Sequence, residues 1–164
     1  MQTNYEEKRK ELEKHLTKRF GKNIPEFYRV YMKTPDFLET FIAFRDSVMK
    51  GGKLSRELKE KIAYLVSVLN ECDACKIAHR KHLEEFGCGA EVEAIDNLKF
   101  DKFDEKESIA LNAAYEVVKN RRISDGTMET LSKKFDEREI IEILSVISLY
   151  MFLNTFNNAL GLRW

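Results

Sequence analysis

The chain has 164 residues, which is enough for one domain whose hydrophobic core needs no metal or set of disulfides. Its 28 lysines and arginines balance 28 aspartates and glutamates, and this net charge of zero removes the usual electrostatic argument for binding nucleic acid or an anionic membrane. The longest apolar run, Ile140–Leu153, is interrupted by Glu142 and Ser145 and falls short of the ~20 residues that a membrane span needs. No secretory signal is visible from Gln2 to Arg19, so we expect a cytoplasmic protein.

Helix start and stop signals recur along the chain, and the alternation typical of strands is absent. We expect N-terminal helices over residues 4–50, in which Pro25 opens a short aromatic helix. The sequence Thr34-Pro35-Asp36 is typical of the start of the next helix, because it combines an N-cap, a proline at the first helical position and an acid in the first turn. These signals predict an all-α protein.

The central part of the chain, about residues 54–120, is predicted to hold four further helices. Ser55 opens the first of them, and the second ends at Gly87. Asp104 begins a later helix through a capping box.

A last, very apolar helix is predicted at about 137–160, and we expect it to be central or buried between subunits. No linker or repeat interrupts the chain, so the prediction is a single domain over residues 1–164.

Two of the three cysteines form a close pair with a histidine behind them. Cys72 and Cys75 are three residues apart, and His79 follows four residues later. A helix turns about 100° per residue, so these steps place all three side chains on one stripe. In a reducing compartment such a pair is more often catalytic or metal-binding than structural, and a bridge across so short a loop removes far less chain entropy than the ~3 kcal/mol of a 15-residue loop. The spacing therefore favours thiol redox chemistry.

The local charges suggest which thiol attacks. Glu71 and Asp73 flank Cys72 and favour its protonated form, whereas Cys75 lies one turn from the possible base His79. We therefore predict that Cys75 attacks and that Cys72 resolves. In other folds with this spacing the first cysteine attacks, and the sequence leaves that alternative open.

Glu60 stands in an otherwise apolar helical stretch, about one helix before the cysteines. If the two helices pack antiparallel, its carboxylate can orient the ring of His79 and pass a proton. The alternative is a surface glutamate beside Lys59 or Lys61, since isolated acids are mostly exposed.

A zinc site is the main rival interpretation, because thiolates and imidazole suit that metal. Only His82, Cys88 or Glu60 could complete four ligands, and no second pair of cysteines or histidines exists. Cys88 is otherwise typical of a small buried apolar residue. Besides the enzyme hypothesis, two alternative functions therefore remain open: a structural zinc-binding helical module, and a redox-sensing interaction protein.

Glu60, Cys72, Cys75 and His79 reproduce a specific pattern: Glu, eleven residues, Cys, two residues, Cys, three residues, His. This pattern resembles the carboxymuconolactone decarboxylase-like superfamily in its alkyl hydroperoxidase (AhpD-like), peroxidase-related branch. The similarity runs over residues 54–87. It implies an AhpD-like helical bundle that assembles as a symmetric homo-oligomer, a trimer or hexamer.

The end of the chain, residues 150–162, is also similar to the ending of peroxidase-related members. The resemblance implies an antioxidant oxidoreductase that reduces alkyl hydroperoxides without haem, metal or other cofactor. Cys75 would become a sulfenic acid, Cys72 would condense with it to a redox-active disulfide, and Glu60 and His79 would relay protons. The implied reductant is a dihydrolipoamide-bearing protein or a peroxiredoxin.

One departure from the family pattern is Ala74, which stands where the alkyl hydroperoxidase proper has a second histidine. We therefore expect a shorter proton relay and a slower or redirected reaction with peroxide. Lactone decarboxylation is not expected, because the decarboxylase members lack the cysteine pair.

Overall fold

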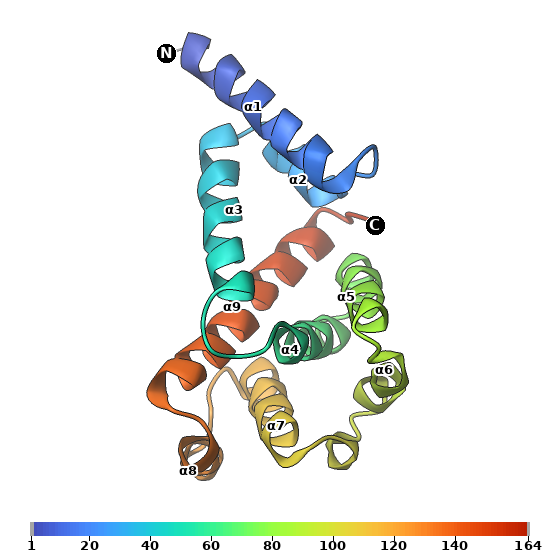
Figure 1. Ribbon diagram of the computed structural model, residues 1–164, viewed down its shortest axis with the longest axis vertical. Helices are drawn as coiled ribbons and strands as arrows, with labels where there is room; N and C mark the ends of the chain where they lie inside the picture. Colours follow the sequence, from blue (N-terminus) through green and yellow to red (C-terminus); the bar gives the residue numbers. More distant parts are fainter. Residues whose placement is uncertain (1, 164) are drawn as a thin grey trace.

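The computed structural model describes residues 2–163, with side chains from Tyr5 onward, and this part of the chain contains helices and no strand (Figure 1). The predicted all-α class is confirmed. The elements in chain order are α1 (Gln2–Phe20), α2 (Glu26–Tyr31), α3 (Pro35–Lys50), α4 (Arg56–Leu69), α5 (Asp73–Glu85), α6 (Gly89–Asp96), a short 3-10 helix (Phe100–Lys102), α7 (Glu105–Asn120), α8 (Asp125–Lys134) and α9 (Glu137–Ala159).

Helix α4 lies at the centre of the packing, in contact with α5, α7 and α9. In Figure 1 it is surrounded by these three helices. Its amino terminus is capped as predicted, since the Ser55 side chain accepts a hydrogen bond from the N–H of Leu58 at 3.1 Å. Residues 58–67 are all buried, so this helix can carry functional groups into the interior only if neighbouring groups compensate their charges.

Helix α9 crosses the molecule and packs on α3, α4 and α7 (Figure 1). Asp136 and Glu139 form the predicted capping box at its start. Part of its apolar surface is open in the single chain, where Ile141 and Phe152 are 63% and 42% exposed, and the predicted burial between subunits stays a prediction. By length and composition alone α9 could cross a membrane, a property shared by core helices of globular proteins.

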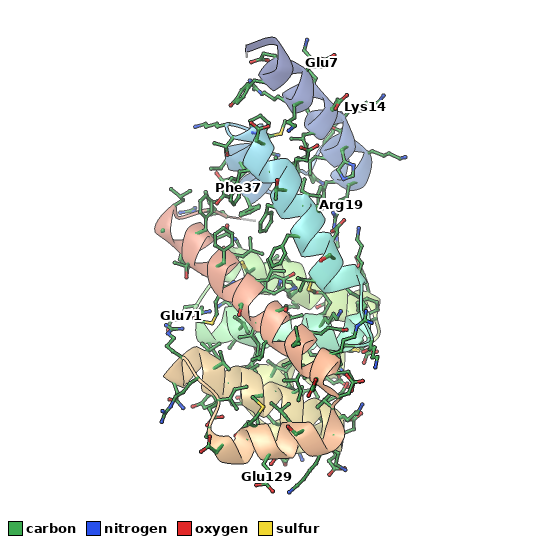
Figure 2. The ribbon with its side chains drawn as sticks, turned by 90° about the vertical axis from the view of Figure 1, so that its left-hand side faces the viewer. Glu7, Lys14, Arg19, Phe37, Glu71 and Glu129 are labelled. Atoms are coloured by element: carbon green, nitrogen blue, oxygen red, sulfur yellow. The ribbon has the colours of Figure 1, made fainter. Side chains whose placement is uncertain are left out.

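The N-terminal helices form one end of the molecule. Helix α1 begins at Gln2 and packs on α3 through a thin stripe that includes the buried Leu12 and Leu16. Figure 2 shows Glu7 and Lys14 pointing outward from α1. Aromatic rings from α2, α3 and α9 meet beneath this end, and they enclose one side of the site described next.

Candidate active site

The cysteine pair lies at the turn from α4 into α5. Glu71 adopts a left-handed backbone conformation with φ of 54°, which reverses the chain within a few residues. Cys72 follows as the N-cap residue of α5, and its backbone N–H donates to the carbonyl of Ser67 at 3.0 Å. The turn therefore holds Cys72 at the start of α5, with Cys75 one helical turn further along.

The two cysteines are buried and not joined by a disulfide, and their sulfurs are in direct contact. Their sulfurs are 2.8 Å apart, and Cys72 and Cys75 are 1% and 6% exposed. The side-chain amide of Asn157, from α9, donates to the sulfur of Cys75 at 3.1 Å. A dithiol this close needs little movement to close into a disulfide.

Cys72 has the lower pKa of the two thiols, which is the reverse of the order expected from its flanking acids. The hydrogen bond from Cys75 lowers the pKa of Cys72 to about 7 against the opposing effect of burial, while the pKa of Cys75 is raised by Cys72 and by burial. The pair therefore loses its first proton at a pKa of about 7, and the remaining proton lies between the two sulfurs. The expected repulsion is weak because the carboxylate of Asp73 is 85% exposed and pairs with Lys76 at 2.6 Å.

Glu60 is fully buried and contacts His79. Its Oε2 lies 2.5 Å from Nδ1 of the imidazole, and Arg56, one turn earlier on α4, pairs with its other oxygen. The alternative of a surface glutamate is therefore wrong. Lys59 and Lys61, the proposed surface neighbours, are buried as well.

The environment of this pair favours a charged acid and a neutral base. Burial raises the pKa of Glu60, but the hydrogen bond from His79 and the charges of the neighbouring cations, Arg56 among them, outweigh it and lower the pKa to about 2. Burial lowers the pKa of His79, so its imidazole is neutral at pH 7. We assign the proton to Nδ1, where it bonds the carboxylate, and this leaves Nε2 able to accept a proton.

A cavity of about 100 Å³ adjoins the site, and Cys75 and His79 both line it. Cys72 is not among its lining residues. Aromatic side chains of α2 and α3 and Tyr150 and Asn157 of α9 also line it, together with charged residues that include Arg45 and Arg163. The ring of Tyr150 packs edge-on against His79 with centroids 4.4 Å apart, and this contact helps to fix the imidazole. Cys75 is thus the sulfur that a small molecule in the cavity would meet.

Reasoning from the sequence missed two groups at the site. Arg56 lies four residues before Glu60 on one helix, and this spacing alone could have suggested the ion pair. Asn157 is 82 residues from Cys75, and no local pattern connects the two.

The zinc interpretation gains no support from the geometry. Among residues that the structure describes, one set of three possible ligands has all its atoms within 4.8 Å of one another: Glu57, Cys88 and Glu91. The three predicted zinc ligands do not form such a set. The ammonium of Lys61 already lies 2.8 Å from Glu57, 2.6 Å from Glu91 and 2.5 Å from Glu107. Cys88 is buried as predicted, and burial raises its pKa to about 11.

Comparison with known proteins gives a family and a fold. Residues 35–116, half of the chain, match the model of the carboxymuconolactone decarboxylase family, and this segment contains both cysteines of the pair. No curated protein sequence matches.

Solved structures share the fold at low identity. An uncharacterized peroxidase-related protein from Silicibacter sp. TM1040 is 24% identical with a TM-score of 0.86, and the match covers 94% of this chain and 84% of that one. An uncharacterized peroxidase-related protein with an alkylhydroperoxidase AhpD core, from Ralstonia eutropha JMP134, is 20% identical with a TM-score of 0.81, and the match covers 94% of this chain and 85% of that one. The debrominase Bmp8, solved with 2,3,4-tribromopyrrole, is 24% identical with a TM-score of 0.75, over 90% and 80%. The chain belongs to the carboxymuconolactone decarboxylase family and has its AhpD-like all-α fold.

Proposed function

We propose that this protein is a thiol peroxidase that reduces organic hydroperoxides through Cys75 and Cys72, with Glu60 and His79 as a proton relay and no cofactor. One observation carries the proposal: a reduced pair of sulfurs 2.8 Å apart, of which Cys75 shares a cavity with a histidine held by a buried carboxylate. A nucleophile beside a base that a third group orients is the usual arrangement for an activated thiol.

The reaction would begin with one proton passing from the dithiol to Nε2 of His79. The imidazolium is stabilised by the ionised Glu60, and the remaining proton lies between the two sulfurs. With that proton on Cys72, the thiolate of Cys75 attacks the outer oxygen of the hydroperoxide. The O–O bond breaks, the sulfur becomes a sulfenic acid, and the departing alkoxide takes the proton from His79.

The second step forms the disulfide. The thiol of Cys72 attacks the sulfenic sulfur of Cys75, an S–S bond forms, and water leaves. Over both steps the dithiol loses two electrons and the hydroperoxide gains them, giving one alcohol and one water. Asn157 would support the attack by donating to the thiolate of Cys75, which is its hydrogen-bond acceptor in the structure.

Single-turnover thiol counting tests this function. One equivalent of cumene hydroperoxide should consume two thiols per reduced chain and leave a Cys72–Cys75 bridge in peptide maps. Cys72→Ser should stop at a sulfenic acid on residue 75, and Cys88→Ser should behave as the parent protein. Consumption of peroxide at the parental rate by Cys75→Ser would overturn the role assignment, and no thiol loss in the parent protein would overturn the function.

The reductant and the assembly belong to the same proposal. The disulfide must be reduced again, and we propose a dithiol donor of the dihydrolipoamide type or a peroxiredoxin in the cytoplasm. We also propose a symmetric homo-oligomer, and the exposed Phe152 and Ile141 on α9 support it as apolar surface that a second copy would cover.

A further inference from the structure

A larger groove adjoins the thiol cavity. It has a volume of about 870 Å³, and its lining includes Arg45, Ala78, His82 and Arg163, which also line the cavity beside Cys75. The two spaces therefore adjoin one another. The cavity beside Cys75 is small and mostly apolar, and the groove is wider.

The groove concentrates positive charge on a chain whose net charge is zero. Two acids, Glu26 and Glu85, line it among the described residues. The cations that line it are Arg19, Arg29, Arg45, Arg56, Lys81 and Arg163. The cations outnumber the acids in this lining, and an excess of one sign in a concave surface raises the local concentration of oppositely charged ligands.

Three of these six cations already form ion pairs with carboxylates of the protein. Arg19 and Arg45 pair with Asp46 at 3.4 and 2.9 Å, and Arg56 pairs with Glu60. The other three have no carboxylate oxygen within 4.0 Å among the side chains that the structure describes: Arg29, Lys81 and Arg163. These three come from α2, from α5 and from the segment after α9, so separate parts of the fold bring available cations to one groove.

We infer that the hydroperoxide reduced by this protein carries a carboxylate, which binds in the groove among Arg29, Lys81 and Arg163 while the peroxide group enters the cavity at Cys75. This inference rests on the proposed function. A cavity of about 100 Å³ admits the reacting end of a substrate but not a whole drug-sized molecule, so the rest of the substrate must lie in the groove. Guanidinium groups match carboxylates by paired hydrogen bonds, and the aromatic wall suits a hydrocarbon segment between the two ends.

The test compares two substrates that differ only in the charge. The 13-hydroperoxide of linoleic acid and its methyl ester, both below micellar concentrations, are mixed with reduced protein, and thiol loss is followed by stopped flow. At low salt we expect the acid to react about tenfold faster than the ester at sub-saturating concentration, and we expect this ratio to fall towards one at 0.5 M salt because screening weakens exposed charges. The double variant Arg29→Gln/Lys81→Gln should lower the ratio in the same way.

Two comparisons make the outcomes decisive. Lys99→Gln/Lys119→Gln removes the same charge from exposed sites outside the groove and should keep the parental ratio. Equal rates for acid and ester, with hydrogen peroxide still oxidising the pair, would overturn this inference and leave the proposed function standing. Failure of every hydroperoxide to oxidise the pair would instead remove the proposed function. If the groove variant slowed only re-reduction by a protein dithiol, the groove would bind an acidic protein partner and the inference would be wrong.

Discussion

Replacing Glu60 with glutamine removes a buried charge and preserves the size of the side chain. The ordinary pKa of 4.5 falls to about 2 in the folded protein, which corresponds to roughly 3 kcal/mol in favour of the ionised form. Because this pKa is depressed, the contribution is complete above pH 4.5 and is lost as the pH falls towards 2. Glutamine keeps an acceptor for Nδ1 of His79, and Arg56, 28% exposed, can turn to water, so we expect a loss of about 2 kcal/mol at pH 7.

The effect of Glu60→Gln on chemistry should exceed its effect on stability. A neutral amide cannot stabilise the imidazolium that forms when His79 takes the thiol proton. The glutamine side chain can also donate through its NH₂ group, so it does not hold the imidazole of His79 in one tautomer as the carboxylate does. We expect single-turnover thiol oxidation by cumene hydroperoxide to slow by about 10- to 100-fold. The assay is stopped-flow thiol loss, with urea unfolding measured on the same preparations.

Glu57→Gln is the matched control, three residues away on the same helix. Glu57 also pairs with a buried cation, Lys61, but that ammonium keeps Glu91 and Glu107. We expect a loss of stability below about 1 kcal/mol and parental thiol reactivity. If Glu60→Gln lost stability and still reacted at the rate of this control, Glu60 would be structural and the relay would be refuted.

Three further outcomes follow from the same geometry. The rate of thiol oxidation should rise with pH through about 7, where the pair loses its first proton. In Cys75→Ala the alkylation midpoint of Cys72 should move up towards 9 because its hydrogen-bond donor is gone, and an unchanged midpoint would contradict the coupling. Asn157→Leu should slow oxidation several-fold, because it removes the hydrogen-bond donor to Cys75. It should leave the melting temperature unchanged or higher, since the buried Oδ1 of Asn157 has no partner among the described residues. A parental oxidation rate in this variant would exclude the role of Asn157. Native mass spectrometry should find one symmetric oligomer in both redox states, and a change of assembly on oxidation would favour the redox-sensor alternative.

The sequence offered the meeting of Glu60 and His79 as one of two alternatives, and the family resemblance favoured it. Both lie two to three helical turns from the chain reversal at Glu71, so an antiparallel packing of α4 and α5 brings them to a similar height. The same spacing placed the cysteines at the start of α5. Helix type and approximate bounds followed from capping residues, as at Ser55 and Asp136.

The burial of α4 could not be predicted, because charged residues are normally assigned to the surface. Lys59 is buried since its ammonium donates to the carbonyls of Val48 and Gly51, and Lys61 is buried among three carboxylates. Glu57 is four residues before Lys61 on α4, a spacing visible in the sequence, whereas the other partners lie on α3, α6, α7 or the turn after α3. No periodicity within α4 reveals those other partners, and the contact of Asn157 with Cys75 was hidden for the same reason.

The pKa values of the two thiols depend more on the contact between their sulfurs than on the acids next to Cys72 in the sequence. Sequence reasoning gave Asp73 weight because it is adjacent to Cys72. In the fold its carboxylate faces water, whereas the two sulfurs are 2.8 Å apart in a buried site where a single hydrogen bond has a large effect.

Arg56 explains how a buried carboxylate can lie near a thiol that must become negative. An uncompensated Glu60 would oppose formation of the thiolate, because like charges repel strongly in a buried site. The guanidinium of Arg56 cancels that charge, so the relay is neutral while His79 is neutral. When the thiol proton moves to His79, the relay gains one positive charge as the sulfur pair gains one negative charge, and the net charge of the buried site stays constant. The site can therefore generate a thiolate without importing an ion, and this requires the arginine as much as the acid and the imidazole.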